Sequence, residues 1–191
     1  MGAPPACRPL GFGAPPLRAL QGRHADFWQV TGDTLDFALQ TLGLNDPQVR
    51  ARLMELYRTL DAFPEVPVVL NRLKAAGLKT VILSNGSPDM LDAAVEKAGI
   101  GGFLDAVLSV EVVGVYKPHP KVYQLAVDRL GIPVSAISFP SSNAWDAYAA
   151  SAFGMRVACN RYGQRPDRLP GRPDREIASL YELPAIVGAQ L

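Results

Sequence analysis

The sequence predicts an α/β protein: a doubly wound, parallel sheet with a small helical cap beside it. Short apolar runs after residue 78 alternate with helical patterns of about ten residues, which is typical of parallel strands joined by crossover helices. Polar residues follow directly after these runs, at the edge where such sheets build their sites. Residues 17–60 indicate the cap, because they show helical periodicity and no strand pattern.

The chain divides into three expected regions. Residues 1–16 form an unmatched segment rich in Gly, Pro and Ala, and their five prolines exclude a continuous helix. Two interpretations of this segment stay open: a disordered tail, and a start that is misplaced or out of frame. Residues 17–62 are expected to form the helical cap domain, and residues 63–191 the α/β core domain.

Two helices are expected in the cap. An apolar stripe with helical spacing predicts a first helix that is capped by Thr31 or Asp33 and ends at Gly43. Residues 47–60 predict a second helix with apolar side chains on one face.

In the core, helices and strands are expected in alternation. The predicted helices span residues 66–76, 88–98, 119–130, 145–153 and 180–187. The predicted strands span residues 79–84, 107–110, 136–139 and 156–160. This order implies right-handed crossovers within one parallel sheet. Pro140, just after the third predicted strand, is tolerable only if the sheet does not need its missing N–H.

Composition excludes several classes of partner. With 48% hydrophobic residues, the 191-residue chain can bury one good core. Lys and Arg number 19 against 18 Asp and Glu, without a basic run, so we expect no nucleic-acid partner. No apolar stretch approaches the ~20 residues that span a bilayer, so we expect no membrane partner. Two cysteines without metal-type spacing suggest a reducing compartment, and we expect a cytoplasmic protein.

The first polar turn comprises Ser84, Asn85, Gly86 and Ser87, between a predicted strand and a predicted helix. Hydroxyl, amide and helix N-terminal N–H groups there can bind an anion such as a substrate carboxylate. The alternative is ordinary capping of the helix by Ser87.

Lys117 and Asp146 lie in two further polar segments, at residues 116–118 and 141–146. Lys117 precedes Pro118 at the start of a rigid loop, and Asp146 is the only acidic residue between Asp128 and Asp167. A desolvated pair of this lysine and this carboxylate in a cleft would be a plausible catalytic element.

The loop before Asp146 argues against a metal. Residues 131–145 contain no Asp or Glu, and Ser141, Ser142 and Asn143 stand where Mg²⁺ would need carboxylate ligands. The two histidines are too dispersed for a metal site. We therefore expect no metal and no cofactor.

Four motifs in this order resemble the haloacid dehalogenase (HAD) superfamily, and within it the L-2-haloacid dehalogenases (type II). They are ADFWQVT at residues 25–31, LSNGSP at 83–88, VYKPHPKVY at 115–123 and SSNAWD at 141–146. Phosphatases of the superfamily carry a Gly-Asp signature where this chain has Ser-Ser-Asn. The resemblance implies a HAD-like, Rossmannoid core and a metal-free hydrolase. An Asp carboxylate would displace halide from C2 of an (S)-2-haloalkanoate, and water would cleave the ester to give the (R)-2-hydroxy acid.

The resemblance, carried over position by position, gives four residues a substrate-binding role. Ser84 would hold the substrate carboxylate, and Asn85 would help to hold the departing halide. Phe27 and Trp145 would line the apolar pocket around C2. The implied partner is a small 2-haloacid, and a homodimer stays open as a further association.

The same resemblance implies five catalytic positions. Lys117 would balance the charge of the attacking carboxylate. Asp146, with Ser141 and Asn143, would position or activate the hydrolytic water, and Tyr123 would brace the loop. Charge passes from carboxylate to halide in the first step, so fixed donors and a dry pocket favour its transition state.

One motif of the family has no counterpart among the 191 residues. The motif Asp-x-Tyr-Gly-Thr is absent, so this chain supplies no nucleophile, and no Arg matches the family's halide-binding one. In this fold the strand with that motif lies between the strands that end at Leu83 and Phe139. Unpaired backbone groups there would cost roughly 1–3 kcal/mol each if buried. We therefore expect the chain as written to lack the first core strand, to be inactive and to fold poorly.

Three hypotheses about function follow. The first is a dehalogenase whose start is misassigned or frameshifted. The second is a truncated, non-catalytic remnant or interaction module. The third is a superfamily phosphatase, which the missing acidic pair disfavours.

Overall fold

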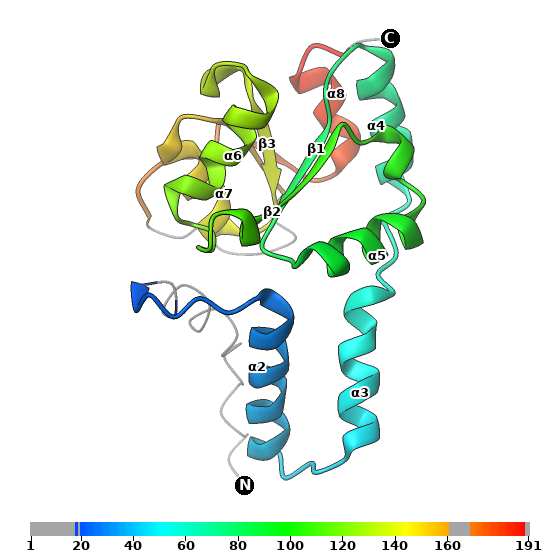
Figure 1. Ribbon diagram of the computed structural model, residues 1–191. Coiled ribbons are helices and arrows are strands. Elements are labelled where there is room, and N and C mark those ends of the chain that lie inside the picture. Colours follow the sequence, from blue (N-terminus) through cyan, green and yellow to red (C-terminus); the bar gives the residue numbers. More distant parts are fainter. Residues whose placement is uncertain (1–17, 19, 161–168, 190–191) are drawn as a thin grey trace, which may run out of the picture.

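The computed structural model describes residues 18, 20–160 and 169–189. The Gly/Pro/Ala-rich segment 1–16 lies outside these residues. Two helices stand apart from the strands in Figure 1: α2 (Phe27–Thr41) and α3 (Pro47–Glu55), which continues as a 3-10 turn, η2 (Leu56–Arg58).

The strands and the other helices alternate along the rest of the chain. The helices are α4 (Glu65–Ala75), α5 (Pro88–Ala98), α6 (Pro120–Leu130), α7 (Ala144–Phe153) and α8 (Leu183–Ile186). Short 3-10 helices are η3 (Gly101–Phe103), η4 (Val110–Val112), η5 (Val134–Ala136) and η6 (Leu180–Glu182). The strands are β1 (Val81–Ser84), β2 (Ala106–Ser109), β3 (Ser138–Ser141), β4 (Arg156–Asn160) and β5 (Arg175–Ile177). The predicted α/β class is confirmed.

α2 begins earlier than the sequence predicted. Asp26 caps it, because its Oδ1 accepts a hydrogen bond from Gln29 N at 2.8 Å. The prediction of Thr31 or Asp33 as the cap is therefore wrong, since both lie inside the helix. All three are residue types that cap helices well, so sequence alone could not choose among them. The earlier start places Phe27 at the first helical position.

All strand pairs are parallel, as predicted, but they form two sheets. One sheet contains β1 and β2, and the other contains β3, β4 and β5 in that order. Among the described residues, no strand pairs with β1 on the side away from β2, or with β3 on the side away from β4. A further core strand between the two sheets stays a prediction.

Pro140 lies on the free edge of β3. Arg156 N donates to Ile137 O at 3.0 Å, so the backbone groups of Ile137 point toward β4. Alternate residues of a parallel strand address the same neighbour, so Ser138 and Pro140 address the opposite edge. The missing N–H of Pro140 therefore leaves the β3–β4 ladder intact, which explains why the sheet tolerates this proline.

Helices cover both faces of β4. Val157 and Cys159 pack in a cluster with α6 and α7, whereas Ala158 packs in a cluster with α4 and α8. This alternation is the period of two of a strand that is buried on both faces. In Figure 1, α6 and α7 lie on one side of the strands and α4 and α8 on the other. The core thus has three layers.

The segment before α2 is tied to the core by Tyr116, which is 1% exposed. Its hydroxyl donates to Ala25 O, and its ring centroid lies 4.9 Å from that of His24. His24 Nε2 is hydrogen-bonded to Glu111 Oε2 at 2.8 Å. These contacts fix where α2 begins relative to the loop that carries Lys117.

We expect Tyr116→Phe to lower the free energy of unfolding by about 1–2 kcal/mol, because the carbonyl of Ala25 loses its donor in a partly buried place. Tyr181→Phe is the matched control, since Tyr181 is 51% exposed and its hydroxyl makes no hydrogen bond to the described residues. Urea unfolding measures both variants. Equal effects would contradict this role of the Tyr116 hydroxyl.

Candidate active site

The predicted polar turns meet at one buried ion pair. Lys117 Nζ lies 3.1 Å from Asp146 Oδ2, and the two residues are 7% and 4% exposed. Lys117 also joins the turn after β1, because its backbone N–H donates to Asn85 Oδ1 at 3.1 Å. Three segments that are far apart in the sequence therefore share one site, at the carboxyl ends of β1 and β3.

Both oxygens of the Asp146 carboxylate are engaged. Oδ1 accepts from the Tyr123 hydroxyl at 2.8 Å, and Oδ2 accepts from Ser141 Oγ at 3.0 Å in addition to Lys117. Asp146 lies in the first turn of α7, where the helix dipole favours a negative charge. These contacts hold the carboxylate in a single orientation.

The surroundings shift the proton affinity of two groups in the site. Burial lowers the pKa of Lys117 from its usual value, while the negative charge of Asp146 and the hydrogen bond to it act in the opposite direction. Burial raises the pKa of Tyr123, and the charge of Asp146 and its hydrogen bond raise it further. Tyr123 therefore stays a hydrogen-bond donor to Asp146 over the whole neutral range.

The turn after β1 is held by its own hydrogen bonds. Ser84 Oγ accepts from Gly86 N at 3.1 Å, and Gly86 O accepts from Ser109 Oγ at 2.7 Å. Ser87 occupies the N-cap position of α5, but its side chain makes no capping hydrogen bond. Capping by Ser87 therefore does not account for the polar residues of this turn.

The other predicted site residues lie at the beginnings of helices. Asn143 is the N-cap of α7, and its backbone N–H donates to Ser141 Oγ at 3.3 Å, which places it beside the ion pair. Trp145 is the second residue of α7. Phe27 begins α2 and packs against the cluster around Tyr116.

Two residues near the site were not predicted. Phe139, on β3, places its ring centroid 4.9 Å from Lys117 Nζ. Tyr116, next to Lys117 in the chain, reaches the segment before α2. The sequence offered one signal for Phe139, its place at the end of a predicted strand directly before the polar turn. The sequence offered no signal that the ring of Phe139 would contact the ammonium group of Lys117.

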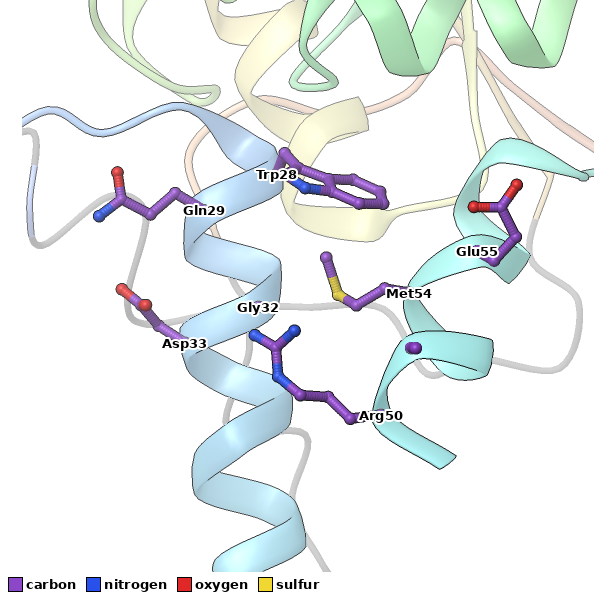
Figure 2. Close-up of a pocket in the computed structure, with 8 residues that line it drawn as sticks. Trp28, Gln29, Gly32, Asp33, Arg50, Met54 and Glu55 are labelled. Carbon is purple, nitrogen blue, oxygen red and sulfur yellow. The ribbon is translucent and has the colours of Figure 1, made fainter. Parts of the chain in front are cut away.

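A cavity of about 360 Å³ lies elsewhere, between α2 and α3, as Figure 2 shows. Trp28 and Met54 form its apolar part. Arg50 also lines it, but Arg50 Nη2 donates to Asp36 Oδ2 at 2.9 Å, so its charge already has a partner. None of the predicted site residues lines this cavity. In the part of the chain that the structure describes, no three His, Cys, Asp or Glu side chains gather as a metal site.

A family model of haloacid dehalogenase-like hydrolases matches residues 16–154. The chain belongs to this family. None of its described helices is both long and apolar enough to cross a lipid bilayer.

Individual relatives are haloacid dehalogenases. (S)-2-haloacid dehalogenase 1 of Pseudomonas sp. (strain CBS-3) is 44% identical over 173 residues, which cover 89% of this chain and 76% of the relative. The (S)-2-haloacid dehalogenase of Pseudomonas sp. (strain YL) is 46% identical over 166 residues, 86% of this chain and 72% of the relative. A solved structure of L-2-haloacid dehalogenase from Xanthobacter autotrophicus, with chloropropionic acid covalently bound, superimposes with a TM-score of 0.86 at 35% identity. The superposition covers 95% of this chain and 83% of the Xanthobacter autotrophicus chain.

We expect Lys117→Met and Asp146→Asn each to destabilise the fold by about 3–5 kcal/mol, because each leaves the partner's charge buried without its counter-charge. The double variant should cost clearly less than the sum of the two, since neither charge remains. Arg18→Met, at the exposed pair with Asp33, is the control and should have little effect. Additive costs in urea unfolding would show that Lys117 and Asp146 do not interact.

We expect Tyr116 and Tyr123 to stay protonated in the folded protein at pH values near 10, where an exposed tyrosine ionises. Burial raises the pKa of both, so the unfolded chain releases these protons at lower pH than the folded chain. Their contribution to stability is therefore complete below about pH 10 and is lost as the pH rises above it. Tyrosinate absorbance should show two late protons, and Tyr123→Phe should remove one of them. An unchanged titration in Tyr123→Phe would contradict the assignment.

Proposed function

We propose that this site hydrolyses the carbon–halogen bond of short (S)-2-haloalkanoic acids and yields (R)-2-hydroxy acids. The observation that carries the proposal is the buried pair of Lys117 and Asp146, fixed by Tyr123 and Ser141 at the carboxyl ends of β1 and β3. The identity to relatives that are (S)-2-haloacid dehalogenases supports the substrate class.

The first step is a displacement at C2. An attacking carboxylate forms a C–O bond to C2 while the C–halogen bond breaks, and halide leaves with the bonding electrons. An ammonium group beside the attacking carboxylate keeps it ionised, which is the role we assign to Lys117. The covalently bound chloropropionic acid in the Xanthobacter autotrophicus structure supports an ester intermediate.

The turn after β1 supplies groups for the substrate carboxylate and the halide. The side-chain oxygen of Asn85 is already taken by Lys117 N, so its NH₂ group is left to donate elsewhere. Ser84 Oγ accepts from Gly86 N and keeps its own hydrogen to donate. We assign the halide to Asn85 and the substrate carboxylate to Ser84. Phe27 and Trp145 are proposed to form the apolar wall around C2.

The second step is hydrolysis of the ester. A carboxylate offers about four acceptor sites, and Lys117, Ser141 and Tyr123 use three of those on Asp146. The remaining site can hold and deprotonate a water molecule, with Asn143 at its side. The water oxygen bonds to the carbonyl carbon of the ester, and the bond from that carbon to the oxygen on C2 breaks. The hydroxy acid leaves with that oxygen and with the proton that Asp146 took from water, and the attacking carboxylate is regenerated.

No described residue provides the attacking carboxylate. Among the described residues, Asp146 is the one carboxylate at hydrogen-bond distance from Lys117 Nζ, and we assign it to the water of the second step. We propose that the nucleophile comes from a further strand between β1 and β3, whose last residue would reach Lys117. The loop groups at Ser141, Ser142 and Asn143, in place of carboxylates, support a route without a metal.

A second copy of the chain and a cytoplasmic location belong to the same proposal. Phe37 on α2 and Val49 on α3 are 53% and 39% exposed, which supports an apolar contact between copies. A sequence with two cysteines, both outside any metal-type pattern, supports a reducing compartment.

A chimera tests the proposal. It joins residues 17–191 to an N-terminal piece of a relative that contains the Asp-x-Tyr-Gly-Thr strand. We expect it to release halide from (S)-2-chloropropionate and to form (R)-lactate, and Lys117→Met to lower its kcat by about 100-fold or more. Residues 1–191 alone should show no turnover, because no described residue provides the attacking carboxylate.

Two outcomes would contradict the proposal. A folded chimera that releases no halide would remove the assigned function, and turnover by residues 1–191 alone would remove the need for an added strand. With Mg²⁺ and p-nitrophenyl phosphate as the control substrate, the chimera should release no phosphate. Phosphate release would favour the phosphatase branch of the family.

A further inference from the structure

The ammonium group of Lys117 lies between a carboxylate and an aromatic ring. Asp146 Oδ2 is 3.1 Å from Lys117 Nζ, and the ring centroid of Phe139 is 4.9 Å from the same atom. A cation within about 6 Å of a ring centroid, over its face, is attracted by the negative face of the ring. This attraction is strongest where water is excluded, and Lys117 is 7% exposed.

We propose that Phe139 is a positioning residue for the reaction: the face of its ring holds the Lys117 ammonium in the place where it meets the attacking carboxylate. This inference rests on the proposed function for its role in catalysis. The contact itself does not depend on that function.

The ring of Phe139 is itself held in place. The rings of Phe139 and Tyr123 meet edge to face, with centroids 5.9 Å apart and planes at 88°. The hydroxyl of Tyr123 donates to Asp146 Oδ1 at 2.8 Å. Lys117, Asp146, Tyr123 and Phe139 therefore form a closed cycle of four contacts, in which each side chain touches the next.

An aromatic ring suits this place better than a second carboxylate would. Lysine has a long, flexible stem, so one ionic contact with Asp146 leaves its ammonium free to pivot. A second carboxylate would fix it but would also cancel its positive charge. The ring of Phe139 fixes the ammonium and leaves that charge available to an incoming anion.

The ring also offsets part of the desolvation of the cation. Burial lowers the pKa of Lys117, so each contact that favours the charged form helps to keep the ammonium protonated. If Phe139 acted only by filling space, a leucine of similar size would serve as well. The titration of Lys117 separates the two roles.

The experiment follows the titration of Lys117 by NMR in protein with isotope-labelled lysine, and Lys117→Met assigns the signal. We expect Phe139→Leu to lower the pKa of Lys117 by about half a unit to one and a half units, and Phe139→Tyr to restore it. Phe153→Leu is the matched control. The ring of Phe153 also packs on Tyr123, with centroids 5.7 Å apart. Phe153 and Phe139 pack against the same core cluster, which contains Tyr123.

The comparison with the control decides the question. No shift in Phe139→Leu, or an equal shift in Phe153→Leu, would overturn the inference. If Phe139→Leu fails to fold, fluorinated phenylalanines at position 139 replace it, because fluorine weakens the ring face and keeps its shape. The pKa of Lys117 should then fall with each added fluorine, and a constant pKa would overturn the inference.

The readout also separates this inference from the proposed function. Titration needs no turnover, so it can be measured both in residues 1–191 and in the chimera. A shift of the Lys117 pKa without halide release by the folded chimera would contradict the function and keep the cation–ring contact.

In an active chimera, Phe139→Leu should lower kcat by about 10-fold and change KM little, because the ammonium acts on the attacking carboxylate and not on the substrate. A rise in KM alone would count against the positioning role.

Discussion

The buried ion pair between Lys117 and Asp146 constrains the rest of the site. Two charges this deep are stable only if their geometry is good and their remaining polar atoms are satisfied. Tyr123 from α6 and Ser141 from β3 meet that demand on the side of Asp146, and Asn85 after β1 holds the backbone of Lys117. The elements β1, β3, α6 and α7 must therefore keep fixed relative positions, so that the ion pair stays charged and shielded from water.

The loop that carries Lys117 also binds the segment before α2. Tyr116 turns toward the segment before α2 and binds Ala25, while its neighbour Lys117 turns toward Asp146. One peptide unit thus connects the entry of α2 to the charged centre.

Much of the site could be predicted because it follows simple rules of parallel sheets. Polar residues directly after apolar runs meet at one edge, so the approach of Lys117, Asp146 and Asn85 could be inferred from their positions along the chain. β5 could not be predicted, since Arg175 and Glu176 are polar and exposed and leave no apolar run. In the sequence, Phe139 looks like an ordinary core residue. Its contact with the ammonium group of Lys117 depends on tertiary packing, which the sequence pattern does not show.

Pro140 has a consequence beyond the sheet in which it lies. An open strand edge is a template on which a strand of another molecule can pair, and proline is one device that proteins use to prevent this. Pro140 is exposed and addresses the side of β3 where no described strand pairs, so a foreign strand would meet a missing donor in the middle of a four-residue edge. Any strand on this side of β3, including the one proposed between β1 and β3, would therefore pair without a donor from residue 140.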